Sequence, residues 1–290
     1  MPGHNGGAQR ERNPIAALTR VLDAMATMDQ PTVGVRELAR MLGAPPSSVQ
    51  RTLESAEELG LVTAAEGQWE LGWELFRLAS IVQARHPYQG AAKVLDELRA
   101  RTGETALLAV YDPRRRERMF VAASQSRQSV RFVPELLSWL PMHAGASALA
   151  ILAYRPEEER QALYAQGSPP VSSTTTPEAV ESALDVVRRN GYAVTHDGVY
   201  FGASGVAAPI ATRTGVTSSV GVIMPKQRFA DAHEATIVGH VKAAAESLGR
   251  RLGDPLSGLA VVSPLPAPGV TDLRPARRGR YQSRRARCRR

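Results

Sequence analysis

Residues 34–71 hold the pattern that most constrains the fold: two short helical segments, a tight break between them, and a hairpin after them. Gly43 and Pro45 interrupt the helical pattern, so the two segments are joined by a turn of only four residues. A turn this short sets two helices at a steep angle to each other. Apolar residues recur at helical spacing on both sides of it: Val35, Leu38, Ala39 and Leu42 before the turn, and Val49, Leu53, Ala56 and Leu59 after it. We therefore expect helices over about 34–42 and 47–59.

Two further patterns in this segment predict the start of the second helix and a hairpin after it. Ser47 with Gln50 three residues later fits a capping box, which makes Ser47 the expected N-cap of the second helix. After that helix, Leu61–Thr63 and Gln68–Leu71 read as two short strands around a turn at Glu66–Gly67. Helix, tight turn, helix and hairpin is the order of a winged helix-turn-helix.

The leading end of the second helix offers short polar side chains, which is where a recognition helix meets base edges. The candidate DNA-binding residues are Ser47, Ser48, Gln50 and Arg51 on this helix, and Arg36 and Arg40 on the preceding one. Glutamine can pair with adenine and arginine with guanine, while the arginines of the preceding helix and the wing at 64–68 would contact the backbone. Glu54, Glu57 and Glu58 follow one or two turns later, and they would face away from DNA in a helix that enters the groove end-on.

The rest of the chain alternates strand and helix patterns, which indicates a second, α+β domain. We expect a disordered arm over 1–12, the winged helix-turn-helix over 13–72, a linker helix region over 73–88, the second domain over 89–253, and a disordered tail over 254–290 that is first Pro-rich and then Arg-rich. Within the second domain we expect helices at 90–101, 145–154, 156–166, 177–190 and 230–252, and strands near 104–111, 117–123, 129–133, 192–196, 204–211 and 217–224.

The formal charge of +8 invites a nucleic-acid interpretation, but its location matters. Residues 274–290 contain nine arginines and no acid, which leaves 27 basic and 28 acidic residues in 1–273. The high charge therefore describes the tail and not the fold, and a block of like charge is typical of a solvated extension. Any help the tail gives to DNA binding would depend strongly on salt.

Composition also excludes several classes. No run approaches the ~18 apolar residues of a membrane helix, and the N-terminus lacks the apolar segment of a secretory signal. The lone cysteine, Cys288, rules out an internal disulfide framework and a cysteine-rich zinc site. We expect a cytoplasmic protein without a cofactor and without a membrane partner.

Enzyme motifs are absent from the sequence: there is no HExxH pair, no G-x-S-x-G elbow and no Walker A loop. His143 lies near Ser147, and His196 adjoins Asp197 a few residues before Ser204, so a hydrolase remains an alternative that an activated ester would test. A structural role for these residues is the simpler interpretation.

Taken together, several stretches resemble the IclR family of bacterial transcription regulators over roughly residues 13–253. The helix-turn-helix stretch VRELARMLGAPPSSVQRTLESAEELGLV and the linker stretch WELGWELFRLA resemble its N-terminal part. Three further stretches resemble the family's effector-domain signatures: LPMHAGASALAILA (140–153), RRNGYAVTHDGVYFGASGVAAPI (188–210) and SSVGVIMP (218–225).

The resemblance implies a homodimer or homotetramer on a palindromic double-stranded DNA operator, more often a repressor than an activator. It also implies a GAF- or profilin-like second domain that binds a small organic acid. Carried over by position, the effector-binding residues are Ala146, Ser147, Thr195, Gly205, Gly221 and Ile223.

The sequence departs from the family pattern at this pocket. Ala148-Leu149 stands where a glycine-lysine pair is common, Thr195-His196-Asp197 where an acidic pair is usual, and Gly221 and Ile223 where small polar residues are common. These changes favour a more apolar pocket and a larger effector such as an aromatic acid. Two alternatives stay open: a degenerate pocket that binds nothing, and a sensor that acts through protein contacts without reading DNA.

Overall fold

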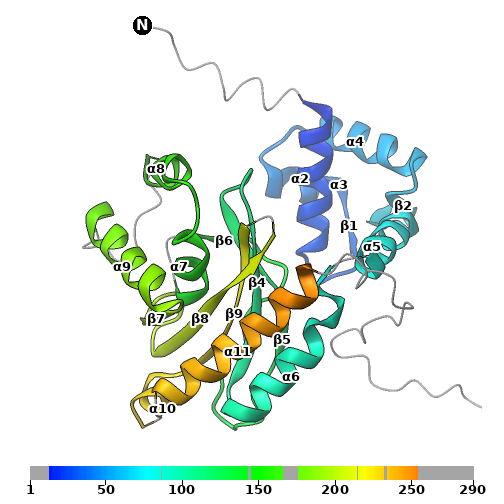
Figure 1. Ribbon diagram of the computed structural model, residues 1–290. Helices are drawn as coiled ribbons and strands as arrows, with labels where there is room; N and C mark the ends of the chain where they lie inside the picture. The colour runs from blue at the N-terminus through cyan, green and yellow to red at the C-terminus, as the bar shows by residue number, and fades with distance from the viewer. Residues whose placement is uncertain are drawn as a thin grey trace, which may run out of the picture. The chain divides into compact units, whose positions relative to one another are not determined.

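The computed structural model describes residues 13–85, 87–142, 145–165, 176–213, 215–231 and 234–253. The predicted arm (1–12) and tail (254–290) lie outside these residues. Figure 1 shows an N-terminal group of helices with a small sheet, and a larger sheet with helices on both faces. No described helix is long and apolar enough to span a membrane.

The N-terminal part is a winged helix-turn-helix. Three helices surround one apolar core: α2 (Pro14–Ala26), α3 (Val35–Leu42) and α4 (Pro46–Glu58). A three-stranded antiparallel sheet in the order β1-β3-β2 completes it: β1 (Thr32–Val33), β2 (Val62–Ala65) and β3 (Gln68–Leu71). The sequence did not predict β1, because two residues are too short to show an alternation. Its Val33 and the Trp69 opposite it on β3 are both buried in this core.

Two details of the α4 prediction are wrong. The N-cap is Pro45, not Ser47, and no side chain caps the helix. Pro46 occupies the first helical position, where its fixed φ favours the helix and its missing N–H costs nothing. Leu59 is 64% exposed rather than packed in the core. The chain has already turned at Gly60 (φ 69), so Leu61 packs on the core in its place.

Both helices of the motif end in the same way. At the end of α4 the Leu61 amide donates to the Ala56 carbonyl, and at the end of α3 the Ala44 amide donates to the Ala39 carbonyl. These are Schellman bonds around left-handed glycines, Gly43 after α3 and Gly60 after α4. The bond after α3 lets the turn between the two helices stay as short as the sequence predicted.

The C-terminal part is built on a six-stranded antiparallel sheet in the order β6-β5-β4-β9-β8-β7. Its strands are β4 (Thr105–Asp112), β5 (Glu117–Ser124), β6 (Leu140–Pro141), β7 (Ala193–His196), β8 (Ala203–Thr212) and β9 (Gly215–Pro225). The predicted strand near 129–133 is wrong, because side chains and not a strand bind this backbone. Thr105 Oγ1 donates to the Phe132 carbonyl, and Arg228 Nη1 donates to the Val130 carbonyl. The short edge strand β6 follows instead.

Helices cover both faces of this sheet. The helices after the N-terminal part are α5 (Trp73–Arg85), the 3₁₀ turn η1 (Pro87–Gly90), α6 (Ala91–Thr102), α7 (Ala146–Leu152), α8 (Glu157–Ala165), α9 (Pro177–Asn190), α10 (Lys226–Asp231) and α11 (Glu234–Gly253). α6 and α11 lie side by side over one face, and α7 packs on the other face with α9 behind it (Figure 1). The single helix predicted at 230–252 is therefore two helices, α10 and α11.

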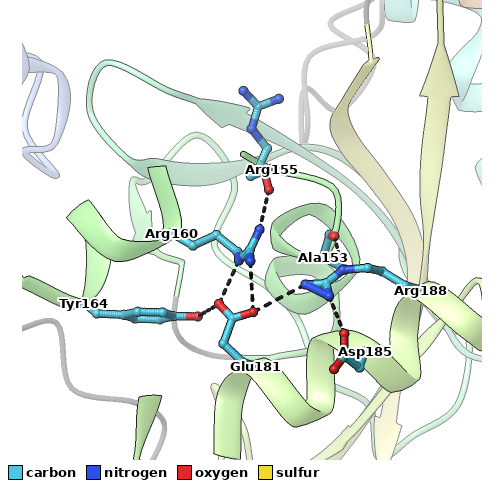
Figure 2. Close-up of polar contacts among 7 residues, drawn as sticks. All are labelled: Ala153, Arg155, Arg160, Tyr164, Glu181, Asp185 and Arg188. Carbon is cyan, nitrogen blue, oxygen red and sulfur yellow. Dashed lines mark hydrogen bonds and ion pairs between the residues drawn. The ribbon is translucent and has the colours of Figure 1, made fainter. Parts of the chain in front are cut away.

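A polar network ties α7, α8 and α9 together (Figure 2). Glu181 of α9 accepts hydrogen bonds from Arg160 Nε at 2.7 Å and from the Tyr164 hydroxyl at 2.9 Å, and both donors belong to α8. Arg188 of α9 reaches Glu181 at 3.4 Å and donates through Nε to the Ala153 carbonyl at the end of α7. Cations near a helix C-terminus are favourable, so this network holds the far end of α7 in place.

We predict that Glu181→Gln lowers the free energy of unfolding by about 1–3 kcal/mol at pH 7, because Arg160 loses its carboxylate partner. Burial alone would raise the pKa of Glu181, but hydrogen bonds from Arg160 and Tyr164 outweigh burial and lower it. A lowered pKa means that this stabilisation is present above the unfolded-state pKa and is lost as the pH falls through the folded-state pKa. The difference between wild type and variant should shrink below about pH 4.

Urea titrations at pH 7 and at acid pH measure both effects. Asp185→Asn is the matched control, because Asp185 pairs with Arg188 but is 57% exposed, and such pairs contribute little. Equal midpoints for Glu181→Gln and Asp185→Asn at pH 7 would contradict the role of the network.

Gly145, which precedes α7, has φ 85° and ψ 159°, a conformation open almost only to glycine. A Cβ there would also lie 2.8 Å from Val199 Cγ2. We predict that Gly145→Ala lowers the free energy of unfolding by about 1–3 kcal/mol. Gly239→Ala is the control, since a Cβ there meets nothing within 4 Å and Gly239 lies inside α11, where alanine should add about 0.5–1 kcal/mol. A wild-type melting temperature for Gly145→Ala would refute the strain.

Candidate DNA interface and ligand cavity

The two faces of α4 differ sharply. Val49, Leu53 and Ala56 are at most 2% exposed and fix the helix on the core. On the other side Ser47 and Arg51 are exposed, while Ser48 and Gln50 are half-buried at the same leading end. The four predicted residues therefore lie together on the first turns of an anchored helix.

Gln50 is held in place by its neighbour one turn later. Its Nε2 donates to Glu54 Oε1 at 2.8 Å. The bond leaves the second N–H and the Oε1 of the amide for another partner, which are the two groups that glutamine uses to pair with adenine. Glu54 is therefore a positioning residue for Gln50 as well as an acid on the surface.

The three glutamates of α4 differ in their contacts. Glu57 Oε1 accepts the backbone N–H of Ala64 at 3.1 Å, so Glu57 fastens the wing to α4. The sequence placed all three glutamates on the side away from DNA. The structure adds that Glu54 and Glu57 have local partners, which explains acids at these positions without any reference to DNA.

The remaining DNA candidates are Arg36 and Arg40, both exposed on α3. The tip of the wing, 64–68, carries no basic side chain, and Gln68 Oε1 accepts a hydrogen bond from Thr32 Oγ1 at 2.6 Å. The wing can therefore offer DNA little beyond backbone N–H groups. Sequence reasoning missed Arg20, whose Nη2 donates to the Leu42 carbonyl at 2.7 Å and braces the turn between α3 and α4.

The C-terminal part contains a small cavity between α7 and the sheet. All six residues predicted for the effector site line it: Ala146, Ser147, Thr195, Gly205, Gly221 and Ile223. Apolar side chains such as Leu107 and Phe120 complete its wall. Its volume is about 40 Å³, which holds water but not a ring, since a benzene-sized cavity is roughly 150 Å³.

A loop from Asp197 to Gly202 covers the cavity, and Gly198, Val199 and Tyr200 from this loop line it. Asp197 organises the loop: it has φ 54°, and its Oδ1 accepts the Gly202 amide at 2.7 Å. Its Oδ2 lies 2.6 Å from Lys226 Nζ. The hydrogen bond from Lys226 is the main cause of the lowered pKa of Asp197, followed by the Gly202 amide. We call residues 197–202 the cover loop.

Glycines let the cover loop, α7 and the sheet approach closely. A Cβ on Gly198 would lie 3.0 Å from Gly145 Cα, and a Cβ on Gly221 would lie 2.2 Å from the Val206 carbonyl oxygen. Position 221 thus has no room for the small polar side chain that the resemblance to the IclR family would place there. Gly205 differs, because a Cβ there would meet Ala146 and Thr195 at an ordinary 3.5 Å.

The hydrolase alternative built on His196 and Ser204 does not fit the geometry. His196 Nδ1 lies 2.8 Å from Ser204 Oγ, but Ser204 is fully buried. Asp197 binds Gly202 and Lys226 and does not orient the imidazole as a triad requires. His143 lies outside the described residues. No group of three potential metal ligands occurs among the residues that the structure covers.

Both parts of this chain are similar to parts of known proteins. A family model described as "Bacterial transcriptional regulator IclR C-terminal" matches residues 79–250, and one described as "IclR helix-turn-helix domain" matches residues 18–66. The HTH-type transcriptional regulator KipR of Bacillus subtilis is 28% identical over 246 residues, which cover 80% of this chain and 96% of that protein. The transcriptional repressor IclR of Escherichia coli is 27% identical over 186 residues, which cover 61% of this chain and 68% of the repressor.

A solved structure has a similar fold. The crystal structure of an IclR homolog complexed with 4-hydroxybenzoate, from Microbacterium hydrocarbonoxydans, superposes with a TM-score of 0.70 at 26% identity and covers 83% of this chain and 99% of that one. The helix-turn-helix of α3 and α4, the six-stranded sheet and both family matches lead to one conclusion. The chain belongs to the IclR family of DNA-binding transcription regulators.

Proposed function

We propose that this regulator is a repressor whose affinity for its operator is changed by an aromatic acid bound in the cavity under the cover loop. One observation carries the proposal: a cavity lined by all six predicted effector residues lies in the same chain as an anchored helix with a polar leading end. The E. coli relative, itself named a repressor, supports the sign of regulation. As a DNA-binding regulator it would act in the cytoplasm.

Base reading on this proposal is confined to the first two turns of α4. Gln50, preset by Glu54, would pair with an adenine, and Arg51 with a guanine. Glu54 and Glu58 lie on the same side of the helix as Ser47 and Arg51, at helical spacing. Acids there would repel phosphates if the helix lay along the groove, so an end-on approach is favoured.

The proposed assembly is a homodimer on a palindromic site, or a tetramer of two such dimers. α5, within the proposed linker region 73–88, carries large apolar side chains that are exposed in the single chain: Trp73 at 81%, Phe76 at 65% and Val82 at 60%. A helix with this much exposed apolar surface is typical of one that meets a partner, here a second copy. Two chains would present two α4 helices to half-sites about one helical turn apart.

The effector must open the cover loop to enter. The cavity of about 40 Å³ is too small for a ring of roughly 150 Å³, so the liganded domain must differ from the one described. The Microbacterium relative has been crystallised with 4-hydroxybenzoate, an aromatic acid, and this supports the same class of effector here. An effector changes operator affinity only through its different affinity for the two arrangements.

The small cavity also favours a second candidate, a regulator that binds its operator without any effector. The two candidates differ in one observable, which is whether an aromatic acid changes operator binding by the wild-type chain.

We predict that Arg51→Ala weakens operator binding by about 1–3 kcal/mol, because a base contact is lost. The probe is the DNA segment upstream of the chain's own gene that the protein protects from cleavage, and the measurement is fluorescence anisotropy at fixed salt. Arg101→Ala, which removes an exposed arginine of α6, is the control and should leave the affinity unchanged. The same titration gives the number of chains per operator. An isotherm for Arg51→Ala that overlies that of Arg101→Ala would rule out base reading by Arg51.

We predict that Gly205→Ala weakens binding of 4-hydroxybenzoate by about tenfold or more, because the new methyl group occupies the cavity. The substitution should fold normally, since its Cβ meets Ala146 and Thr195 at 3.5 Å. Calorimetry measures the affinity, and Gly239→Ala on α11 serves as the matched control. Equal affinity in both variants would place the effector elsewhere.

A further inference from the structure

Arg118 of β5 is the largest side chain in the described residues that is fully buried. It lies two residues before Phe120 on the same strand, so both side chains are on the face of the sheet that α7 covers. Phe120 lines the cavity, and Arg118 Cζ lies 5.3 Å from the centre of its ring. A positive charge is therefore stacked directly on a side chain of the cavity wall.

A second contact places the same guanidinium at the start of α7. Arg118 Nη2 lies 3.5 Å from the position that a Cβ on Gly145 would occupy. Gly145 also lines the cavity. The guanidinium is thus adjacent to two wall residues that come from different elements, β5 and the turn before α7.

The charge persists at this position. Burial lowers the pKa of Arg118 to about 10, while Tyr200 of the cover loop raises it. A guanidinium with this pKa is protonated at neutral pH. Removing a cation from water costs several kcal/mol, and an apolar residue of similar size at such a position is often neutral or stabilising.

The short helix beside the cavity does not supply this charge. α7 has only seven residues and a buried, almost entirely apolar surface. The charged side chain next to this cavity wall is Arg118 on the strand, close to the aromatic ring of Phe120.

We propose that Arg118 selects an aromatic monocarboxylate as the effector, with the ring of the effector beside Phe120 and its carboxylate toward the Arg118 guanidinium. This inference rests on the proposed function of the cavity as an effector site. Attraction between an anion in the cavity and a buried cation is screened far less than attraction at the surface. Arginine is also suited to carboxylates because its donors match both oxygens.

The test compares acids with their uncharged amides on the full chain. The probes are the pairs benzoate and benzamide, and 4-hydroxybenzoate and 4-hydroxybenzamide, measured by calorimetry. We expect the wild type to prefer each acid by about tenfold or more, as for a charge-assisted contact. Arg118→Met, which keeps the length and removes the charge, should lose this preference and still bind the amides as the wild type does. A urea titration of this variant checks that it is folded.

Arg118→Lys keeps a positive charge, and it provides a second test if Arg118→Met does not fold. It should retain a preference for the acids, reduced because lysine cannot pair with both oxygens. A wild type that binds acid and amide equally, or an Arg118→Met that keeps the preference, overturns the assignment to Arg118 while the effector site stands. Absence of binding by all four probes to the wild type overturns the proposed effector site itself.

Discussion

The close approach of the turn before α7 to the cover loop is the constraint on which the C-terminal site depends. Gly145 has a backbone conformation that other residues rarely adopt, and Gly198 lies against it with no room for a side chain. Both glycines line the cavity, whose volume is about 40 Å³. The far end of α7 is fixed by Arg188, so α7 is held at one end and covered at the other. The cover loop, whose ends at Asp197 and Gly202 both have positive φ, is the segment that the proposed ligand entry would displace.

DNA recognition in this chain depends on local geometry rather than on net charge. The described part of the chain contributes little of the +8, because nine arginines lie in residues 274–290. Within the helix-turn-helix, two acidic side chains make structural hydrogen bonds. Glu54 accepts one from Gln50, and Glu57 accepts one from the backbone of the wing. What remains for DNA is the leading end of α4, and the turn before it is held by the Schellman bond after α3 and by Arg20.

The sequence predicted the helices, their order and the tight turn, because these depend on local spacing and on glycine. It placed the N-cap at Ser47 because the capping-box pattern is common, while the proline before it had already started the helix. It predicted a strand near 129–133 because apolar alternation cannot show that Thr105 and Arg228, distant in sequence, bind that backbone. The six residues predicted for the effector site came from family motifs, and the fold brings them into one cavity. Arg118 could not be found from the sequence, since only the tertiary fold buries it.

A buried cation beside a closed cavity gives the two states of such a domain different energies. In the closed state the protein has already removed Arg118 from water, which is an unfavourable step that folding must offset. An anion that enters beside Phe120 recovers part of that energy only in the liganded arrangement, with the cover loop displaced. A ligand shifts an equilibrium only by its differential affinity, and to move a population from about 1:99 to 99:1 requires a difference near 5.5 kcal/mol. The tenfold preference expected for charge pairing corresponds to about 1.4 kcal/mol of this difference, so the ring of the effector must contribute as well. On the proposal made above, Arg118 is therefore the residue best placed to make the two arrangements differ in their affinity for an anion.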